Sequence, residues 1–230
     1  MTYSPAQAGV MTGEDYWTSL GLIGGSTGMA PIISANKTIP AVDAYSSGLS
    51  APAITDSVLK YVHGTGGNCA VSWNLGATYD KVLGLCYFQM ATTGDLQGIW
   101  FSENTYTGTP STSYYEDGYV LWNNAYGAAD SLYFYNKIGA AYTQIGIDST
   151  ICSNDDVFAP AYGLAMYLEK GNPGVQKIFM KDGSTSQWFQ LFSTTDGNFT
   201  TGFQSFGIAT GYQSGNVGRM ISPLYVWGVE

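Results

Sequence analysis

A long series of short apolar runs, each about the length of a β-strand, is the feature that most constrains how this chain can fold. Turn-rich spacers such as ATTGD and TYTGTPSTS separate the runs. Short strands joined at regular intervals by turn residues are typical of β-sandwiches and β-barrels. No segment repeats apolar residues at helical spacing over enough turns to predict a helix, so the sequence predicts an all-β fold. The runs occupy residues 57–64, 69–76, 81–89, 98–104, 118–124, 131–137, 141–146, 162–170, 176–183, 187–194, 203–213 and 221–228.

Residues within these runs alternate between apolar and amphipathic side chains. In the run SLYFYNK, Leu132 and Phe134 point to one face of a strand and Tyr133 and Tyr135 point to the other. This pattern predicts two packed antiparallel sheets, with one face of each in a core and an outer face rich in tyrosine. The predicted core residues are Val71, Trp73, Leu83, Leu85, Leu132, Phe134, Leu164, Met166, Ile178, Met180, Ile208, Leu224 and Val226.

The composition supports an all-β fold and excludes some classes of partner. The chain has 30 glycines, 18 tyrosines and 10 phenylalanines, and only 11% of its residues are charged. Residues that favour turns and strands are therefore abundant, whereas good helix formers are scarce. The net charge is −9, and the 8 basic residues are dispersed rather than clustered. Nucleic acid and membrane surfaces are excluded as expected partners because both require concentrated lysine and arginine.

The first 55 residues differ from the rest of the chain. Glycine, serine, proline and alanine recur there, with only short apolar pieces such as Leu20-Gly21-Leu22-Ile23. The sequence therefore predicts two parts: an extended, irregular N-terminal arm over residues 1–55 and a β-sandwich domain over residues 56–230. We expect the arm to make attachment or oligomer contacts, and its removal to leave a folded sandwich. No basic segment followed by an apolar core begins the chain, so we expect no ordinary export signal.

Three stretches of the sandwich resemble a known family. These are GDLQGIWFSENTYTG with the following YYEDGYVLWNNAYGAADSLYFYNKIGAAYTQIG, then YGLAMYLEKGNPGVQKIFMKDGSTSQWFQLFSTTDGNF, and finally GFQSFGIATGYQSG with ISPLYVWGV. Their order of strands and turns is similar to that of concanavalin A-like, laminin-G-type jelly rolls, over roughly residues 56–230. The resemblance implies a two-sheet antiparallel jelly-roll sandwich. It also implies one of three roles: a lectin, a polysaccharide-cleaving enzyme, or a structural or adhesive module.

The enzyme role conflicts with the distribution of acidic residues. Retaining glucanases of this family carry closely spaced catalytic carboxylates on one strand, and this chain has no such set. Its acidic pairs, at residues 14–15, 116–117 and 155–156, are adjacent in sequence, so on a strand they would point to opposite faces. The single histidine, His63, lies near a glycine-rich turn, and no G-x-S-x-G motif frames a serine. We therefore predict no enzyme activity and no catalytic residues.

Two further positions could bind ligands. Members of the family often hold calcium at the rim of the sandwich, and Asn154, Asp155 and Asp156 offer hard oxygen donors in one loop. The alternative is that these residues only form turns through side-chain to backbone hydrogen bonds. Calcium is thus a possible cofactor rather than an expected one. The single arginine, Arg219, either anchors a carboxylate or carbonyl within the chain or contacts a ligand or a neighbouring subunit.

The leading functional hypothesis is a non-enzymatic structural protein of a virion surface, such as a capsid decoration, turret or fibre component. An acidic chain with a long N-terminal arm, no expected export signal and no catalytic constellation fits this role. Its partners would be copies of itself and other virion proteins, and its location the virion surface. The alternative is an extracellular, lectin-like carbohydrate-binding module, and the third possibility is a glycan-cleaving enzyme with an unrecognised site. Exposed rings would do the binding, with Trp122, Tyr133, Tyr135 and Tyr212 as candidates.

Overall fold

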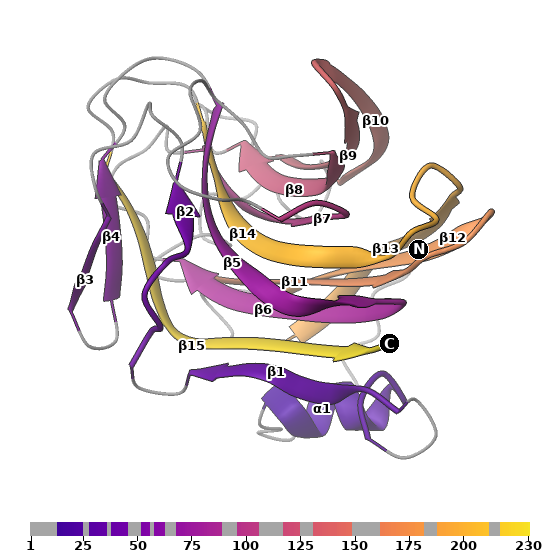
Figure 1. The fold of residues 1–230 in the computed structure, drawn as a ribbon, viewed down its shortest axis with the longest axis horizontal. Coiled ribbons are helices and arrows are strands. Elements are labelled where there is room, and N and C mark those ends of the chain that lie inside the picture. The colour runs from indigo at the N-terminus through magenta and orange to yellow at the C-terminus, as the bar shows by residue number, and fades with distance from the viewer. Residues whose placement is uncertain are drawn as a thin grey trace.

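The structure is a computed structural model of the chain. It describes residues 13–24, 28–35, 38–45, 52–55, 58–62, 68–88, 96–105, 117–124, 131–148, 162–181, 188–211 and 217–230. These residues form one short helix, α1 (Gly13–Ser19), and fifteen β-strands in two sheets that pack face to face (Figure 1). No helix among them is long and apolar enough to cross a membrane.

Sheet A is the larger of the two sheets and has eight strands. Its longest strand, β15, pairs with β6 on one side. On the other side β15 pairs with β4 near its start and with β1 (Ala30–Ala35) near its end. The remaining order across the sheet is β13 (Trp188–Asp196), β12 (Gly174–Lys181), β11 (Tyr162–Glu169), β6 (Lys81–Phe88), β15 (Val217–Val229), β4 (Val58–Val62) and β3 (Ala53–Thr55).

Sheet B has seven strands, and its order also brings distant parts of the chain together. The late strand β14, for example, lies between β5 and β7. The order is β10 (Ala141–Asp148), β9 (Ser131–Ile138), β8 (Gly118–Asn124), β7 (Leu96–Ser102), β14 (Phe203–Gly211), β5 (Asn68–Tyr79) and β2 (Ala44–Tyr45). All strand pairs in both sheets are antiparallel, which confirms the predicted all-β, two-sheet sandwich.

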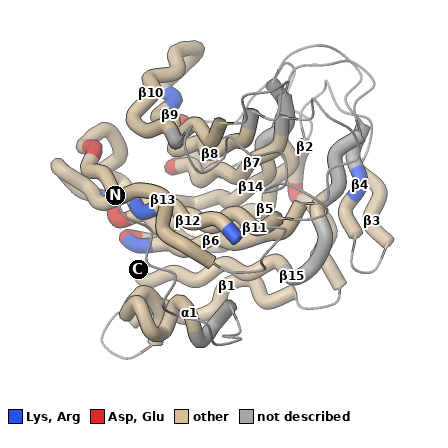
Figure 2. The backbone as a smooth tube through the Cα atoms, turned by 180° about the vertical axis from the view of Figure 1, so that it is seen from behind, with Lys and Arg blue, Asp and Glu red and all other residues tan. Residues whose placement is uncertain are grey.

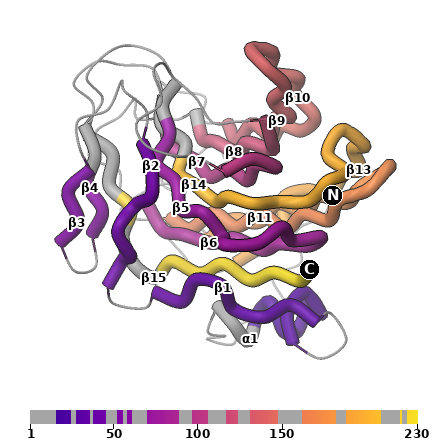
Figure 3. Tube along the Cα trace, in the orientation of Figure 1, coloured from indigo at the N-terminus to yellow at the C-terminus, as the bar shows by residue number. Residues whose placement is uncertain are grey.

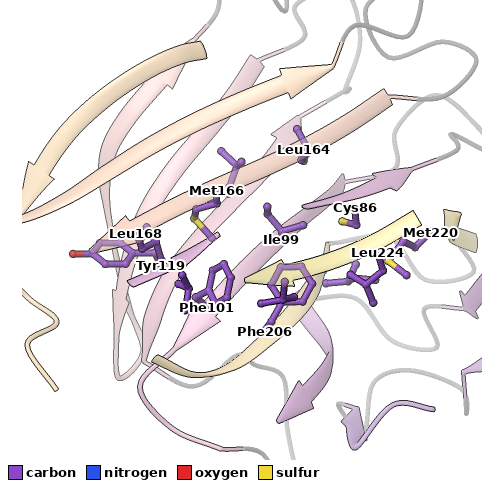
Figure 4. Packing of buried hydrophobic residues seen from close by; sticks show 14 of the residues in the cluster. Cys86, Ile99, Phe101, Tyr119, Leu164, Met166, Leu168, Phe206, Met220 and Leu224 are labelled. Carbon is purple, nitrogen blue, oxygen red and sulfur yellow. The ribbon is translucent and has the colours of Figure 1, made fainter. Parts of the chain in front are cut away.

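The main hydrophobic core lies between the sheets and is built from alternate residues of their strands. Figure 4 shows Ile99 and Phe206 of sheet B in the same core as Met166 and Leu164 of sheet A. The sheets approach closely at Gly84, where an added Cβ would lie 2.5 Å from the Phe206 ring. A glycine at this point of β6 therefore makes room for the ring in the close-packed core.

Every residue that the sequence predicts to be in the core is buried. Two of them, however, lie on the other side of sheet A. Leu83 and Leu85 point away from sheet B and belong to a second apolar cluster that α1 covers. Strand β6 is thus buried on both faces, which is why its sequence is almost continuously apolar rather than alternating.

The described part of residues 1–55 contains helix α1 and three short strands, β1, β2 and β3. Trp17 of α1 is fully buried against the outer face of sheet A, and β1 extends the same sheet beside β15. Figure 3 shows this early segment running alongside the C-terminal strand. Two further short strands, β2 and β3, pair with β5 and β4. The segment shows no periodicity because each piece is short and pairs with a distant partner; its contacts to other chains remain a prediction.

The free energy of unfolding is expected to fall in alkaline solution, because a tyrosine in the cluster beneath α1 titrates at higher pH in the folded chain than in the unfolded chain. Burial raises the pKa of the Tyr87 phenol to about 12, and a hydrogen bond from Trp188 opposes this only in part. In the unfolded chain the phenol titrates near pH ~10. Between these two values the unfolded chain releases a proton that the folded chain retains, so the free energy of unfolding falls as pH rises.

The substitution Tyr87→Phe is expected to flatten that decline, because it removes one of the groups that titrate differently in the two states. Urea denaturation of both proteins near pH ~8 and near pH ~11 measures the effect. Equal losses of stability in the two proteins over this interval would show that Tyr87 does not contribute.

Candidate functional site

The outer face of sheet B, which is turned away from the main core, carries one in-register row of side chains across five strands. The row contains Ser72 of β5, Gly207 of β14, Trp100 of β7, Val120 of β8 and Tyr135 of β9. Because neighbouring strands lie about 4.8 Å apart, the row spans roughly 19 Å. Small residues occupy its β5 and β14 end, and larger apolar and aromatic side chains occupy the rest.

Four half-buried rings on this face form a group that we call the ring cluster: Trp122 of β8, Tyr133 and Tyr135 of β9, and Tyr142 of β10. Tyr133 and Tyr135 stack at 5.9 Å between ring centroids, and Trp122 and Tyr142 stack at 6.2 Å. Tyr135 meets both Trp122 and Tyr142 edge-on, at 6.0 Å each. The cluster therefore combines stacked and edge-to-face pairs, the two arrangements that aromatic rings prefer.

The hairpin of β9 and β10 places these rings on one face. Trp122 and Tyr133 lie opposite each other across β8 and β9, so their side chains are direct neighbours. The chain then reverses through Gly139, whose φ of 58° lies in the left-handed region that glycine adopts without strain. Beside Tyr133 across β9 and β10 lies Ile147, which is 46% exposed and extends the apolar surface of the cluster.

A buried floor supports the ring cluster from below. Trp100 and Val120 are fully buried on this face, and Trp122 and Tyr142 pack against them. Trp100 lies across Gly207, where an added Cβ would come 2.2 Å from the indole Nε1. A larger residue at position 207 would displace this indole. The floor fixes the rings above it, and rigid rings lose little conformational freedom on binding.

The Tyr135 phenol is a neutral hydroxyl group in neutral solution, as tyrosine ordinarily is, and burial reinforces this. Burial raises the pKa of the Tyr135 phenol, and the neighbouring Tyr133 raises it further, whereas a hydrogen bond from Trp122 lowers it in part. The protonated phenol can both donate and accept hydrogen bonds. The cluster thus offers flat apolar surfaces edged by neutral polar groups.

A pair of charged residues lies at the end of the ring cluster nearest the turn between β9 and β10. Lys137 is only 4% exposed although it points to the outer face of sheet B, and it is in register with Tyr142. Its Nζ lies 3.7 Å from Oδ1 of Asp117, which directly precedes β8. The same oxygen accepts a hydrogen bond of 2.6 Å from the backbone N–H of Gly139. We call Asp117 and Lys137 the polar pair.

A hydrogen-bond network on the core side of the same strands is centred on Asp196 at the end of β13. Tyr119 donates to its Oδ2 at 2.9 Å, and Asn136 donates to the same atom at 3.3 Å. Asn198 donates to both carboxylate oxygens, at 2.8 and 3.0 Å. Gln176 completes the network by donating to the Tyr119 hydroxyl at 3.2 Å. Since Asn136 lies between Tyr135 and Lys137, this network holds β9 in place directly behind the site.

The structure brings together three of the candidate residues that the sequence suggests: Trp122, Tyr133 and Tyr135 all belong to the ring cluster. Arg219 lies on β15 in sheet A, in register with Lys60, and is therefore on a different sheet from the rings. Tyr212 lies outside the described residues. Whether these residues bind a ligand remains a prediction.

Sequence reasoning missed Tyr142 and the polar pair. Tyr142 stands at an alternating position of the run that ends in QIG, so the pattern used for Tyr133 and Tyr135 could have found it. Asp117 and Lys137 are twenty residues apart in sequence and meet only through the register of β8 and β9, which pairs Gly118 with Lys137. No local signal indicates such a meeting.

A metal site is not formed among the residues that the structure describes. No group of three or more histidine, cysteine, aspartate and glutamate side chains is placed there to hold an ion. Asp196 does not fit calcium either, because the groups around its carboxylate are N–H and O–H donors rather than further oxygen ligands. The predicted calcium ligands Asn154, Asp155 and Asp156 lie outside the described residues, so the calcium hypothesis remains a prediction.

Solved structures with the same arrangement of sheets identify the fold. A legume lectin-like domain from Entamoeba histolytica matches with a TM-score of 0.53 at 13% identity, over 87% of this chain and 99% of that one. The exoplasmic/lumenal domain of VIP36, in a form bound to Ca²⁺ and Man3GlcNAc, matches with a TM-score of 0.62 at 10% identity, over 88% and 90%. The chain has the lectin-like jelly-roll fold.

A third match comes from a phage protein. It is the CBM2 module of the evolved Dit of Lactobacillus casei BL23 phage J-1, with a TM-score of 0.59 at 9% identity, over 87% of this chain and 96% of that one. No family model matches the sequence, and no curated protein sequence matches it. At these levels of identity the similarity concerns the fold alone.

Proposed function

We propose that the chain is a non-catalytic carbohydrate-binding module and that the ring cluster is its contact surface. The observation that carries this proposal is the set of four half-buried rings on the outer face of sheet B, held over a buried floor and flanked by a charged pair. The apolar C–H face of a pyranose ring packs well against such rings, whereas its hydroxyl groups need nearby donors and acceptors. The cluster supplies both kinds of group.

Two of the solved structures with the same fold support this proposal. VIP36 was crystallised with Man3GlcNAc, and the phage domain is described as a CBM2 module. The lectin alternative therefore has more support than the virion role that the sequence alone favours.

Binding is tested by comparing Tyr133→Ala with a matched control, Tyr225→Ala. Both tyrosines are half-buried and stack on one neighbour, Tyr133 on Tyr135 at 5.9 Å and Tyr225 on Trp227 at 5.3 Å. Tyr225 belongs to the cluster on the outer face of sheet A. Loss of a contact ring costs roughly 1–2 kcal/mol of binding, so we expect Tyr133→Ala to weaken binding about tenfold.

The assay is affinity electrophoresis and calorimetry with a panel of soluble polysaccharides, run beside measurements of released reducing ends. Weaker binding by Tyr133→Ala, unchanged binding by Tyr225→Ala and no turnover is the expected result. Equal affinities of the two variants would contradict the ring cluster as the contact surface. Turnover that disappears when a single carboxylate is changed to its amide would contradict the non-catalytic role.

A second candidate role is display on a virion surface, which the similarity to a module of a phage protein favours. In this role the chain would bind glycans while it forms oligomers or attaches to other virion proteins. An extracellular location is the alternative. Labelling intact particles with an antibody to the chain and imaging them by electron microscopy tests this role, and labelling confined to soluble protein would contradict it.

A further inference from the structure

Asp117 is an exposed carboxylate whose position is fixed from several directions. Its backbone oxygen accepts hydrogen bonds from the Ser102 hydroxyl at 2.6 Å and from the Glu103 N–H at 3.3 Å. Its Oδ1 accepts from the Gly139 N–H and lies near Lys137 Nζ. Despite these contacts, 39% of the Asp117 side chain is exposed. A carboxylate that is both held in place and open to solvent is preorganised to accept hydrogen bonds from a ligand.

The neighbouring Lys137 cannot itself be the main contact. Its side chain is 5% exposed, so the charge is almost entirely withdrawn from solvent. Burial of an ammonium group is unfavourable unless an anion lies close by, and Asp117 provides that anion. Lys137 therefore holds the carboxylate in position, while the carboxylate remains the more exposed member of the pair.

The polar pair is close to the ring cluster. Lys137 follows Tyr135 by two residues on the same face of β9, which corresponds to a separation of about 7 Å along the strand. Across the hairpin it lies directly opposite Tyr142, a member of the cluster. A sugar ring packed on Tyr135 or Tyr142 would therefore bring its hydroxyl groups within reach of Asp117.

We propose that the Asp117 carboxylate accepts a hydrogen bond from a hydroxyl group of the bound sugar, and that Lys137 is the residue that positions this carboxylate. The class of ligand is uncharged glycan. This proposal rests on the proposed function and extends it to specificity. A carboxylate accepts strong hydrogen bonds from sugar hydroxyls but repels uronate and sialate groups. The net charge of −9 on the whole chain acts in the same direction.

The simpler explanation for Asp117 is that it only stabilises the turn between β9 and β10, because its carboxylate accepts a hydrogen bond from the Gly139 N–H. Stabilising the turn needs only one side-chain oxygen, Oδ1, and the amide oxygen of an asparagine could accept the same hydrogen bond. This role requires neither an acid nor a lysine buried beside it. The substitution Asp117→Asn separates the two roles, since it keeps an acceptor of nearly the same shape and removes the charge.

The experiment uses the full chain and two groups of probes. Neutral probes are β-glucan, mannan, xylan and fructan, and anionic probes are polygalacturonate and alginate. Asp117→Asn is compared with Asp80→Asn, a control at an exposed carboxylate (45% exposed) in the turn between β5 and β6, which pairs with Lys170 just after β11. Affinity for the best neutral probe should fall about tenfold or more in Asp117→Asn and stay unchanged in Asp80→Asn. Discrimination against the anionic probes should shrink in Asp117→Asn alone.

A second measurement tests for direct contact. Monodeoxy derivatives of the preferred sugar are titrated into the original protein and into Asp117→Asn, so that loss of the carboxylate and loss of one hydroxyl form a double-mutant cycle. One deoxy position should cost about tenfold in the original protein and little in the variant. Lys137→Met should reduce this coupling too, although Lys137 does not touch the sugar.

The outcomes distinguish this inference from the function on which it rests. One contrary outcome is that Tyr133→Ala weakens binding whereas Asp117→Asn does not, and another is that no deoxy position couples to residue 117. In either case the carboxylate binds no sugar hydroxyl, so this inference is wrong while the proposed function stands. If uronate polymers bind more tightly than neutral ones, the ligand class is wrong. If Tyr133→Ala has no effect, the proposed function itself fails.

Discussion

The substitution Trp17→Ala is expected to lower the free energy of unfolding by about 3–5 kcal/mol, the usual cost of removing a large aromatic side chain from a core. Trp17 is fully buried, and its ring packs edge-on against Phe179 at 5.0 Å and Trp188 at 4.9 Å. Helix α1 has only seven residues and is too short to be stable by itself. Loss of this one ring therefore removes the fully buried contact of the helix with sheet A and leaves the partly buried Tyr16, which meets Phe179 at 6.2 Å.

Chemical denaturation of Trp17→Ala and of Leu20→Ala checks this prediction. Leu20 follows the same helix but is 42% exposed, so its truncation should cost less than about 1 kcal/mol. Similar midpoints for the two variants would mean that α1 does not stabilise the fold.

Deletion of residues 1–40 is expected to be more damaging still. It removes β1 from beside β15 together with α1, and it exposes the apolar cluster that includes Leu83, Leu85 and Phe179. The truncated chain should aggregate when expressed, although the sequence alone suggests a folded sandwich. A soluble truncated chain with an undiminished midpoint of unfolding would contradict this expectation.

The substitution Asp196→Ala is expected to cost about 3 kcal/mol of stability and also to weaken ligand binding. It removes the carboxylate acceptor of the buried Asn136 amide and of the Tyr119 hydroxyl, which as a donor keeps only a long hydrogen bond of 3.5 Å to the Asp196 backbone oxygen. An unsatisfied buried group costs roughly 1–3 kcal/mol. Because Asn136 lies between Tyr135 and Lys137 on β9, the same change loosens the strand that carries the site. Binding to neutral polysaccharide should fall even where the chain remains folded.

Denaturation and calorimetry on the same preparations measure both effects, with Asp80→Ala as the control. Asp80 pairs with Lys170 at 2.6 Å, but its side chain is 45% exposed, so its loss should change stability by less than about 1 kcal/mol. An Asp196→Ala variant as stable as this control would show that the network does not support the sandwich.

Much of the fold follows from the sequence because strands have a strict period of two. Alternation in the runs at 131–137 and 176–183 correctly separates Phe134 and Ile178, which face the core, from Tyr133 and Lys177, which do not. The same rule places Trp122, Tyr133 and Tyr135 on one face. It fails for β6, where both faces are buried and alternation disappears.

The rest depends on contacts between distant parts of the chain. Helix α1 gives no periodic signal because it is short. It packs through the rings of Trp17 and Tyr16, which meet strands more than 160 residues away in sequence. The polar pair is likewise created by strand register rather than by local sequence. Charge counts give no hint of it either, since the charged residues are sparse and spread over the described backbone, as Figure 2 shows.

Helix α1 makes the two broad faces of the sandwich unequal. It covers part of the outer face of sheet A, while the ring cluster lies on the outer face of sheet B. A polymer would therefore engage each copy from one side only. If several copies stood on a support with α1 toward it, their ring clusters would point the same way and one polymer chain could bridge them. Modest single-site affinity would then grow through avidity, by factors of about 10²–10⁴ when the spacing of copies matches the polymer.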